Sequence, residues 1–505
     1  GHSRHLHHGL RLMSIILILI PILAAIAILM GGKAKSIATL AAFANLIIGL
    51  GVVFCWKWDG WDLSLEVLSK PSIHLSLGFY DGMSLIMVIL SVIVLFTAVM
   101  SGKCPEGREK LWYSSILLIG AGALGAFLST DLFFFYAFHE MALIPTFLMI
   151  GILGSGERKE AAWKITIYLA FGSIVLLAGL IWLVAASGSE SWLFSELLAS
   201  EIDPSAQKGI AALLIIGFGI LISLFPFHSW AAPAYASAPA PVAMLHAGVL
   251  KKFGLYGLLR LYPMVATGMQ AWLTVLIVLL LCNILWVGFV TLNQKRLDMM
   301  LGNSSVMHMG YIFLAFAALV EAGSFAANPL AKPAAVVLMF AHGISIALLF
   351  MLTDTIRRKT GTVELAELGG LAKAAPRLAF LFGLAAMASI GLPGLANFSG
   401  EVLVFLSGFN SYTGESFSIV QIATILALWG VVISAVYMLR AFRQTFHGPS
   451  VAHTDSNHVK DFGPFCQIPA AILAIALLVV GLYPNSLLNL LKTPDAPAPA
   501  EQAAE

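Results

Sequence analysis

Carboxylates, amines and imidazoles appear in this sequence inside long apolar stretches, where a charge is costly. Glu140 lies in F-F-F-Y-A-F-H-E-M-A-L-I, Lys252 in H-A-G-V-L-K-K-F-G-L and Glu401 in L-A-N-F-S-G-E-V-L-V-F. Ionisable side chains within membrane segments are rare, and they mark ion or proton pathways. The alternative for a buried carboxylate is a structural group that is hydrogen-bonded to a neighbouring helix. These residues favour a proton or ion pathway.

Several further polar residues could take part in such a pathway. Lys164 lies near a helix end, where its ammonium could instead reach the membrane surface. His228 and His246 equally fit a relay and a satisfied structural group. Lys251 and Lys252 cannot both face one cavity, because neighbouring residues point in different directions. Together the candidate residues are Glu140, Lys252, Glu401, His342, His308, Lys164 and His228.

Composition places the chain in a lipid bilayer. Of its 505 residues, 59% are hydrophobic and 11% are charged, with a mean hydropathy of +0.92. A soluble domain has about 25% charged residues. The net charge of +2 forms no basic stripe, so nucleic acid is not an expected partner. The four cysteines form no C-x-x-C pair and no phosphate-binding loop is present, so we expect no metal, cofactor or ATP site in this chain.

One stretch, residues 225–260, organises the chain. It is apolar but contains four prolines that prevent an unbroken helix, at Pro226, Pro233, Pro239 and Pro241. Broken backbone at membrane depth is tolerated only where it faces protein or a water-filled cavity. A helix that resumes near Pro239 places Lys252 about 20 Å from its start, at ~1.5 Å per residue. That depth is too great for Lys252 to reach the surface.

The second half repeats this arrangement. The stretch I-G-L-P-G-L-A-N-F-S-G-E (390–401) loosens a helix just before the buried Glu401. Two interrupted segments, each beside a buried charge and in different halves of the chain, are typical of transporters that are built from repeats.

The apolar runs predict an all-α polytopic membrane protein with about fourteen spans of roughly 17–25 residues. The His-rich residues 1–12 are excluded from the fold, Trp56, Trp58 and Trp61 indicate an interfacial loop, and the Pro/Ala-rich tail is expected to be disordered. The predicted spans are 12–30, 36–55, 80–100, 112–129, 131–153, 162–185, 208–227, 239–261, 271–294, 300–320, 334–356, 376–392, 417–444 and 466–484, with a shorter piece at 397–413.

A buried acid and a buried lysine together can move a proton. If Glu140 and one lysine of the 251–252 pair lie ~4 Å apart, their attraction is ~4 kcal/mol at an effective dielectric near 20. Separation to ~12 Å removes more than half of that attraction, so a small helix movement could load or release the proton. Lysine suits this role because it can lose its proton, whereas arginine stays charged.

Six motifs in order over residues 80–485 resemble the antiporter-like subunits of respiratory complex I, and the M-type subunits most closely. The motifs are F-H-E-M-A-L-I-P, F-P-F-H-S-W, A-P-A-P-V-A-M-L-H-A-G-V-L-K-K-F-G-L-Y-G-L-L-R, S-S-V-M-H-M-G, A-H-G-I-S and G-L-P-G-L-A-N-F-S-G-E. The resemblance implies two inverted five-helix repeats, each with a Pro/Gly-broken helix. The expected regions are N-terminal helices (1–110), a first repeat (111–298), a second repeat (299–445), and a last helix with the tail (446–505).

The resemblance also implies roles for particular residues. Glu140 matches the family's buried glutamate, Lys252 rather than Lys251 its broken-helix lysine, Glu401 its distal acid, and His342 lies on the linking polar axis. Proton transport in that family is driven by quinone reduction in neighbouring subunits. NADH, FMN, iron–sulfur clusters and quinone are therefore expected in partner subunits, and other membrane-arm subunits, including antiporter-like ones, as partners. The expected location is a bacterial inner membrane, or else an organellar inner or thylakoid membrane.

Two positions depart from the family pattern. The chain reads W-A-A-P-A-Y after F-P-F-H-S where the family has W-L-P-D-A-H, so that Asp and His are missing. Asp298 stands where an ungapped comparison places a relay lysine. Lys295, three residues earlier on a similar helix face, is a candidate substitute.

The sequence also allows two other interpretations. A multisubunit Na⁺/H⁺ antiporter or a membrane-bound hydrogenase would use the same fold and many of the same motifs. A membrane scaffold that moves no ions would instead have apolar or Ser/Thr-rich helix interfaces, without Glu140, Lys252 and Glu401.

Overall fold

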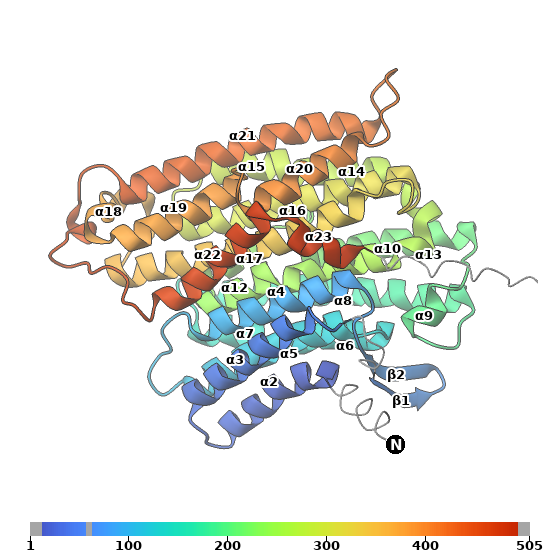
Figure 1. The fold of residues 1–505 in the computed structure, drawn as a ribbon, viewed down its shortest axis with the longest axis horizontal. Helices are drawn as coiled ribbons and strands as arrows, with labels where there is room; N and C mark the ends of the chain where they lie inside the picture. Colours follow the sequence, from blue (N-terminus) through green and yellow to red (C-terminus); the bar gives the residue numbers. More distant parts are fainter. Residues whose placement is uncertain (1–12, 57–62, 493–505) are drawn as a thin grey trace, which may run out of the picture.

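The computed structural model describes residues 13–56 and 63–492. It is a bundle of helices that run alongside one another (Figure 1). The His-rich segment 1–12, Trp58, Trp61 and the Pro/Ala-rich tail lie outside the described residues.

Thirteen labelled elements precede the break in the central helix, and η1, α13 and the remaining elements follow it. The first set is α2 (Met13–Leu29), α3 (Ala34–Val52), β1 (Leu63–Ser69), β2 (Ser72–Leu77), α4 (Gly82–Val99), α5 (Glu109–Leu128), α6 (Leu132–Met141), α7 (Leu143–Leu153), α8 (Arg158–Ser187), α9 (Phe194–Leu197), α10 (Pro204–Ile222), α11 (Ala231–Ser237) and α12 (Ala240–Gly248). The next set is η1 (Leu250–Lys252), α13 (Phe253–Gln270), α14 (Leu273–Leu281), the π-helical turn η2 (Cys282–Trp286), α15 (Val287–Leu292), α16 (Leu297–Ala322) and α17 (Ala331–Thr360). The last set is η3 (Leu365–Glu367), α18 (Leu371–Ala374), α19 (Pro376–Ile390), α20 (Ala396–Phe409), α21 (Ile419–Phe446), η4 (Ala452–Thr454), α22 (Gln467–Leu482) and α23 (Asn485–Leu491).

The prediction of an all-α polytopic membrane protein is confirmed. Within the described residues, 11 helical segments are long and apolar enough to cross a membrane, or 12 if α22 and α23, bent by 74°, form one span. Three further apolar helices, α2, α19 and α20, are shorter than those spans. The count of fourteen, the inverted repeats and the division at residues 110, 298 and 445 stay predictions.

A β-hairpin follows the interfacial loop, where the sequence analysis expected no strands. β1 and β2 pair antiparallel, with Leu63 opposite Leu77, and in Figure 1 they lie beside the end of α6. The segment S-I-H-L-S-L alternates apolar and polar residues, as does L-S-L-E-V-L-S up to Val67, where the pairing shifts register, and this is the two-residue period of a strand. His74 of β2 donates its backbone N–H to the carboxylate of Asp131 (3.0 Å), the residue that caps α6.

The innermost helices are α4, α12, α13, α16 and α17. Every residue of α4 and of α12 is buried, whereas α8 exposes one apolar face that includes Trp163, Ile167, Phe171 and Ile174. These four positions recur every three to four residues, as expected for one face of a helix. The outer helices thus shield the inner ones from lipid, and polar groups on the inner helices are surrounded by protein.

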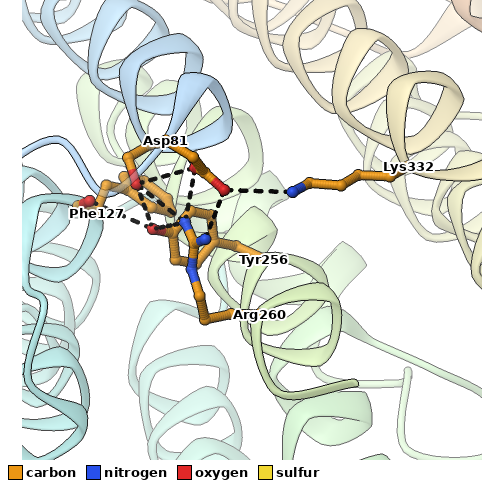
Figure 2. A network of polar contacts seen from close by, with 6 residues as sticks. Asp81, Phe127, Tyr256, Arg260 and Lys332 are labelled. Atoms are coloured by element: carbon orange, nitrogen blue, oxygen red, sulfur yellow. Dashed lines mark hydrogen bonds and ion pairs between the residues drawn. The ribbon is translucent and has the colours of Figure 1, made fainter. Parts of the chain in front are cut away.

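An ion network ties three inner helices together at one end of the bundle (Figure 2). Arg260 of α13 donates to both carboxylate oxygens of Asp81 at 2.7 and 3.0 Å, and to the hydroxyl of Tyr256 at 2.7 Å. Lys332 of α17 lies 3.3 Å from the same carboxylate. Asp81 also caps α4 by accepting from the backbone N–H of Ser84 (3.1 Å). One carboxylate therefore holds α4, α13 and α17 in a fixed arrangement.

This network stays charged over the physiological pH range. Burial by itself would raise the pKa of Asp81, but the charge and hydrogen bonds of Arg260 and the charge of Lys332 hold that pKa well below its usual range. A carboxyl with a depressed pKa contributes stability that is present above its unfolded pKa of about 4 and is lost only as the pH falls below that value. The contribution of Asp81 is therefore constant between neutral pH and mildly acidic pH.

We predict that Asp81→Asn destabilises the protein strongly. Asparagine caps a helix as well as aspartate does, so the change isolates the loss of charge, which leaves Arg260 buried without its counter-ion and costs about 3–5 kcal/mol. The matched control is Asp203→Asn, because Asp203 caps α10 through the backbone N–H of Ser205 and forms no ion pair with any residue that the structure describes. Thermal unfolding of the detergent-purified protein measures both. Equal, small effects of the two substitutions would contradict the assigned role of the network.

Candidate functional site: a buried polar axis at the broken helix

The break in the central helix falls at the two lysines. Pro239 and Pro241 lie at the start of α12, where proline fits without breaking a hydrogen bond. The helix is interrupted instead at Val249, whose φ of −124° and ψ of −62° are not helical, and a 3₁₀ turn over Leu250–Lys252 follows before α13. The sequence analysis predicted a broken helix correctly but attributed the break to the prolines alone.

Lys252 is completely buried and lies between a backbone carbonyl and an imidazole. Its Nζ donates to the carbonyl oxygen of Ala247 (2.5 Å) and is 2.7 Å from Nδ1 of His342 on α17. Carbonyls at the end of a helix segment lack an intrahelical partner, so the break itself provides an acceptor for the lysine. An amine and an imidazole in hydrogen-bond contact can exchange one proton.

Two histidines continue the line from Lys252 into the second half of the chain. The rings of His342 and His308 are stacked with their centroids 5.7 Å apart. His308 has an acceptor at each nitrogen, because Nδ1 is 2.8 Å from the carbonyl oxygen of Ser304 and Nε2 is 3.1 Å from that of Ser389. A proton on either nitrogen of His308 therefore finds a hydrogen-bond partner. Nε2 of His342 has no such partner within the described residues.

Glu401 lies at the far end of this line. It is buried on α20, and no ion pair joins it to another residue in the part of the chain that the structure describes. Its carboxylate fills the space beside Gly391, whose φ is +91° and where an added Cβ would lie 2.2 Å from Oε2. Gly391 follows two residues after Ser389, the acceptor of His308. Glu401 is thus buried beside the second break, as the sequence analysis predicted, and it adjoins the segment whose Ser389 contacts His308.

Glu140 departs from its expected setting. Its side chain is 28% exposed, and it accepts a hydrogen bond from the hydroxyl of Ser173 (2.6 Å). Among the described residues it forms no ion pair with Lys251 or Lys252. Glu140 is therefore only partly buried within this chain, and its role as the family's buried glutamate stays a prediction. Neighbouring helix residues point in different directions, and the inward position belongs to His139, which stacks on Phe253 with centroids 4.1 Å apart.

The remaining candidates lie away from the axis. Lys164 is half-buried and lines a cavity of about 420 Å³. His228 is half-buried between α10 and α11 and stacks on Phe225 at 5.1 Å. Lys295 is exposed and precedes α16, which begins at Leu297. The expectation that Lys295 shares a helix face with Asp298 is therefore wrong, because the helix does not extend back to it.

Asp298 is a structural residue at the start of α16. It is buried and forms ion pairs with Arg296 (3.0 Å) and Arg357 (2.7 Å). Arg357 belongs to the last turn of α17, so this ion pair ties the start of α16 to the end of α17. Because its carboxylate is paired with two arginines, Asp298 is not available to replace the relay lysine that the family comparison expects at this position.

Sequence reasoning missed several polar residues near the axis. Asn283 is fully buried in the π-helical turn η2, where its side chain accepts from the backbone N–H of Phe225 (2.7 Å) and donates to the carbonyl oxygens of Ser223 and Val306. Tyr235 hydrogen-bonds His246 at 2.9 Å. The only sequence signal for Asn283 is that it is a single amide in an apolar run. The only signal for Tyr235 is its hydroxyl within the proline-rich stretch.

Comparisons with known proteins agree with this geometry. Residues 129–427, more than half of the chain, match the family model described as NADH:quinone oxidoreductase/Mrp antiporter, TM. The chain belongs to this family. Within it, NAD(P)H-quinone oxidoreductase chain 4 of Synechococcus sp. is 33% identical over 480 residues, covering 93% of this chain and 89% of that protein. NADH-quinone oxidoreductase subunit M of Rickettsia felis is 31% identical, covering 84% and 83% of the two chains.

Solved structures of antiporter-like proteins share the fold. A chain of respiratory complex I from Thermus thermophilus superposes with a TM-score of 0.83 and 25% identity, covering 95% of this chain and 100% of that one. A chain of the Mrp complex from Dietzia sp. superposes with a TM-score of 0.80 at 20% identity, which shows the fold alone. The resemblance to the M-type antiporter-like subunits of complex I is confirmed.

Proposed function

We propose that this chain is a proton-translocating subunit in the membrane arm of an NADH:quinone oxidoreductase. The observation that carries the proposal is the buried line Lys252–His342–His308 with Glu401 at its end. Three of these four groups are nitrogen bases, which bind protons, whereas a hard cation such as Na⁺ prefers a shell of oxygen ligands. The chain moves protons along these groups while quinone reduction in neighbouring subunits supplies the driving force.

We assign the redox chemistry to partner subunits. The relatives are named as chain 4 or subunit M of a larger oxidoreductase, and NADH, FMN, iron–sulfur clusters and quinone would be bound elsewhere in that complex. The expected partners are other membrane-arm subunits, including neighbouring antiporter-like ones. The protein is a multi-pass membrane protein, and we place it in a bacterial inner membrane, or in a thylakoid or plasma membrane like that of its cyanobacterial relatives.

The break at Lys252 gives the proton step a physical basis. In a 3₁₀ turn between two helices, Lys252 depends on one carbonyl and one imidazole for its hydrogen bonds. A shift of α12 against α13 would change both contacts at once. Because an isolated ammonium is costly to bury, such a shift would release its proton or return it to His342. Glu140, Lys164 and His228 would act at the periphery of this route.

A multisubunit cation/proton antiporter is the second candidate, because the family description includes Mrp antiporters and the Dietzia Mrp complex shares the fold. The names and higher identity of the oxidoreductase relatives favour the first candidate. Purification of the chain from its native membrane in mild detergent distinguishes the two. Flavin and iron–sulfur subunits that co-purify with NADH:quinone activity support the oxidoreductase, whereas antiporter subunits without quinone reduction support the alternative.

We predict that Lys252→Arg abolishes proton pumping nearly as completely as Lys252→Ala. Both lose a group that can release its proton, because arginine stays charged, and general acid–base steps contribute ~10²–10⁴-fold to rates. Proton uptake or release by liposomes that contain the purified complex, divided by the rate of quinone reduction, is the measurement. The control is Lys208→Arg, at an exposed lysine over the ring of Trp272. Normal pumping by Lys252→Arg would rule out a proton-carrying Lys252.

Two glycines in the second break provide a matched test of Glu401. Gly391 and Gly394 have φ values of +91° and +97°, so alanine is strained at either position by about 1 kcal/mol. Only at Gly391 would the new Cβ collide with the carboxylate of Glu401, whereas at Gly394 its nearest neighbour is Leu482 at 3.9 Å. We expect similar losses of thermal stability but a loss of pumping in Gly391→Ala alone. Equal pumping by the two variants would argue against a role for Glu401.

A further inference from the structure

Three adjacent cavities lead from one end of the bundle toward Lys251. The largest of the three, about 420 Å³, is lined by the exposed Ser155, Glu157 and Glu160 and by the buried Ser237 and Asp298. A second, about 230 Å³, shares Ser155 and Ser237 with it. A third, about 10 Å³, shares Asp298 with the first and Arg357 with the second. The shared lining residues place these cavities next to one another, in an order that leads from the exposed Ser155 to the buried Tyr235.

The inner end of the route is Tyr235. This residue lines the smallest cavity, which has the volume of about one water molecule. Thr353 lines it too, and its hydroxyl has no hydrogen-bond partner within the described residues. The hydroxyl of Tyr235 lies 2.9 Å from Nδ1 of the buried His246. Tyr235 therefore connects a polar, water-sized space with an imidazole in the interior.

Lys251 lies directly behind Tyr235. It is completely buried, with its Nζ 5.3 Å from the ring centroid of Tyr235 and 6.0 Å from that of Trp230, and it donates to the hydroxyl of Ser305 at 3.0 Å. Ring faces stabilise a cation without accepting its proton. No described carboxylate forms an ion pair with Lys251. Its ammonium can thus lose a proton without leaving an unpaired anion behind.

The far side of Lys251 adjoins the polar axis. Ser305 is next to Ser304 on α16, and the hydroxyl of Ser304 lies 3.3 Å from Nδ1 of His308 and 2.6 Å from the hydroxyl of Tyr437. Lys251 and Lys252 thus have partners on two different helices that also carry the histidines of the axis, Ser305 on α16 and His342 on α17. Adjacent lysines with different partners can transfer a proton one after the other.

We propose that Lys251 is a second proton-carrying lysine, loaded from these cavities by way of Tyr235 and His246. The proposal rests on the proposed proton-translocating function and adds the uptake side of the route. Lys251 as a neutral amine takes up one proton and becomes an ammonium, then returns to the amine as it passes the proton on toward Ser305 and the axis. Each hydroxyl on the way accepts one proton and releases its own, so no charge remains on it.

Three substitutions in the intact complex test this proposal. Lys251→Met keeps the length of the side chain but removes the base, Lys251→Arg keeps the charge but does not release a proton, and Tyr235→Phe removes only the hydroxyl. We expect pumping per quinone reduced to fall at least ~10-fold in all three, within the range of a lost acid–base group. Lys208→Met, which removes a surface lysine over a ring, should pump like the unaltered complex.

The outcomes separate this proposal from the function on which it rests. Normal pumping by Lys251→Met and Tyr235→Phe, with pumping lost in Lys252→Met, would overturn the role of Lys251 alone. Normal pumping by Lys252→Met and Glu401→Gln as well would overturn proton translocation by this chain. If the Lys251 variants do not assemble, Tyr235→Phe decides, because it keeps the ring that packs against Lys251. A fall in quinone reduction with an unchanged pumping ratio would show a structural role for Tyr235 and also overturn the proposal.

Discussion

The constraint on which the rest of the structure depends is the break in the central helix at Val249, which leaves the carbonyl oxygen of Ala247 to a side-chain donor deep inside an apolar bundle. Lipid offers neither a donor for the freed carbonyl oxygen of Ala247 nor a counter-ion for a charge beside it. Lys252 and this carbonyl satisfy each other, which is possible only where protein surrounds both. The enclosure by α4, α16 and α17 follows from that need, as does the placement of His342 and His308 within reach of the amine.

The helix α13 carries two kinds of cation with different consequences. Arg260, two turns beyond Lys252, is held by Asp81, Tyr256 and Ser84 and stays charged in every state. Lys252 at the other end borders a broken helix and has an imidazole as its partner. Because α13 is fixed by charge near its middle and begins at an interruption, we expect movement to be concentrated at the lysines. A fixed anchor and a variable proton site on one helix are what coupling of motion to protonation requires.

The sequence indicated which polar side chains are costly to bury, but not which way those side chains point. Lys252, His342 and Glu401 were predicted because an amine, an imidazole and a carboxylate in apolar runs must be enclosed. Proline and glycine predicted two interruptions, although the first one falls at Val249 and not at a proline. The outward turn of Glu140, the surface position of Lys295 and the contacts of Lys251 depend on how helices rotate about their axes and where they begin. Those properties come from packing between segments far apart in the chain, such as α6 on α8, which local residue patterns do not specify.

Pairing distinguishes structural charges from those that can carry protons. In the described part of the chain, Asp81 and Asp298 each have two cationic partners and join helices at opposite ends of α17. Glu401 and Lys251 are also buried but have no ion pair among the described residues. A paired charge resists titration, because loss of either charge strands its partner. When a residue without an ion pair gains or loses its proton, only the solvation of its own charge changes. The buried residues without an ion pair are therefore those that fit proton transfer.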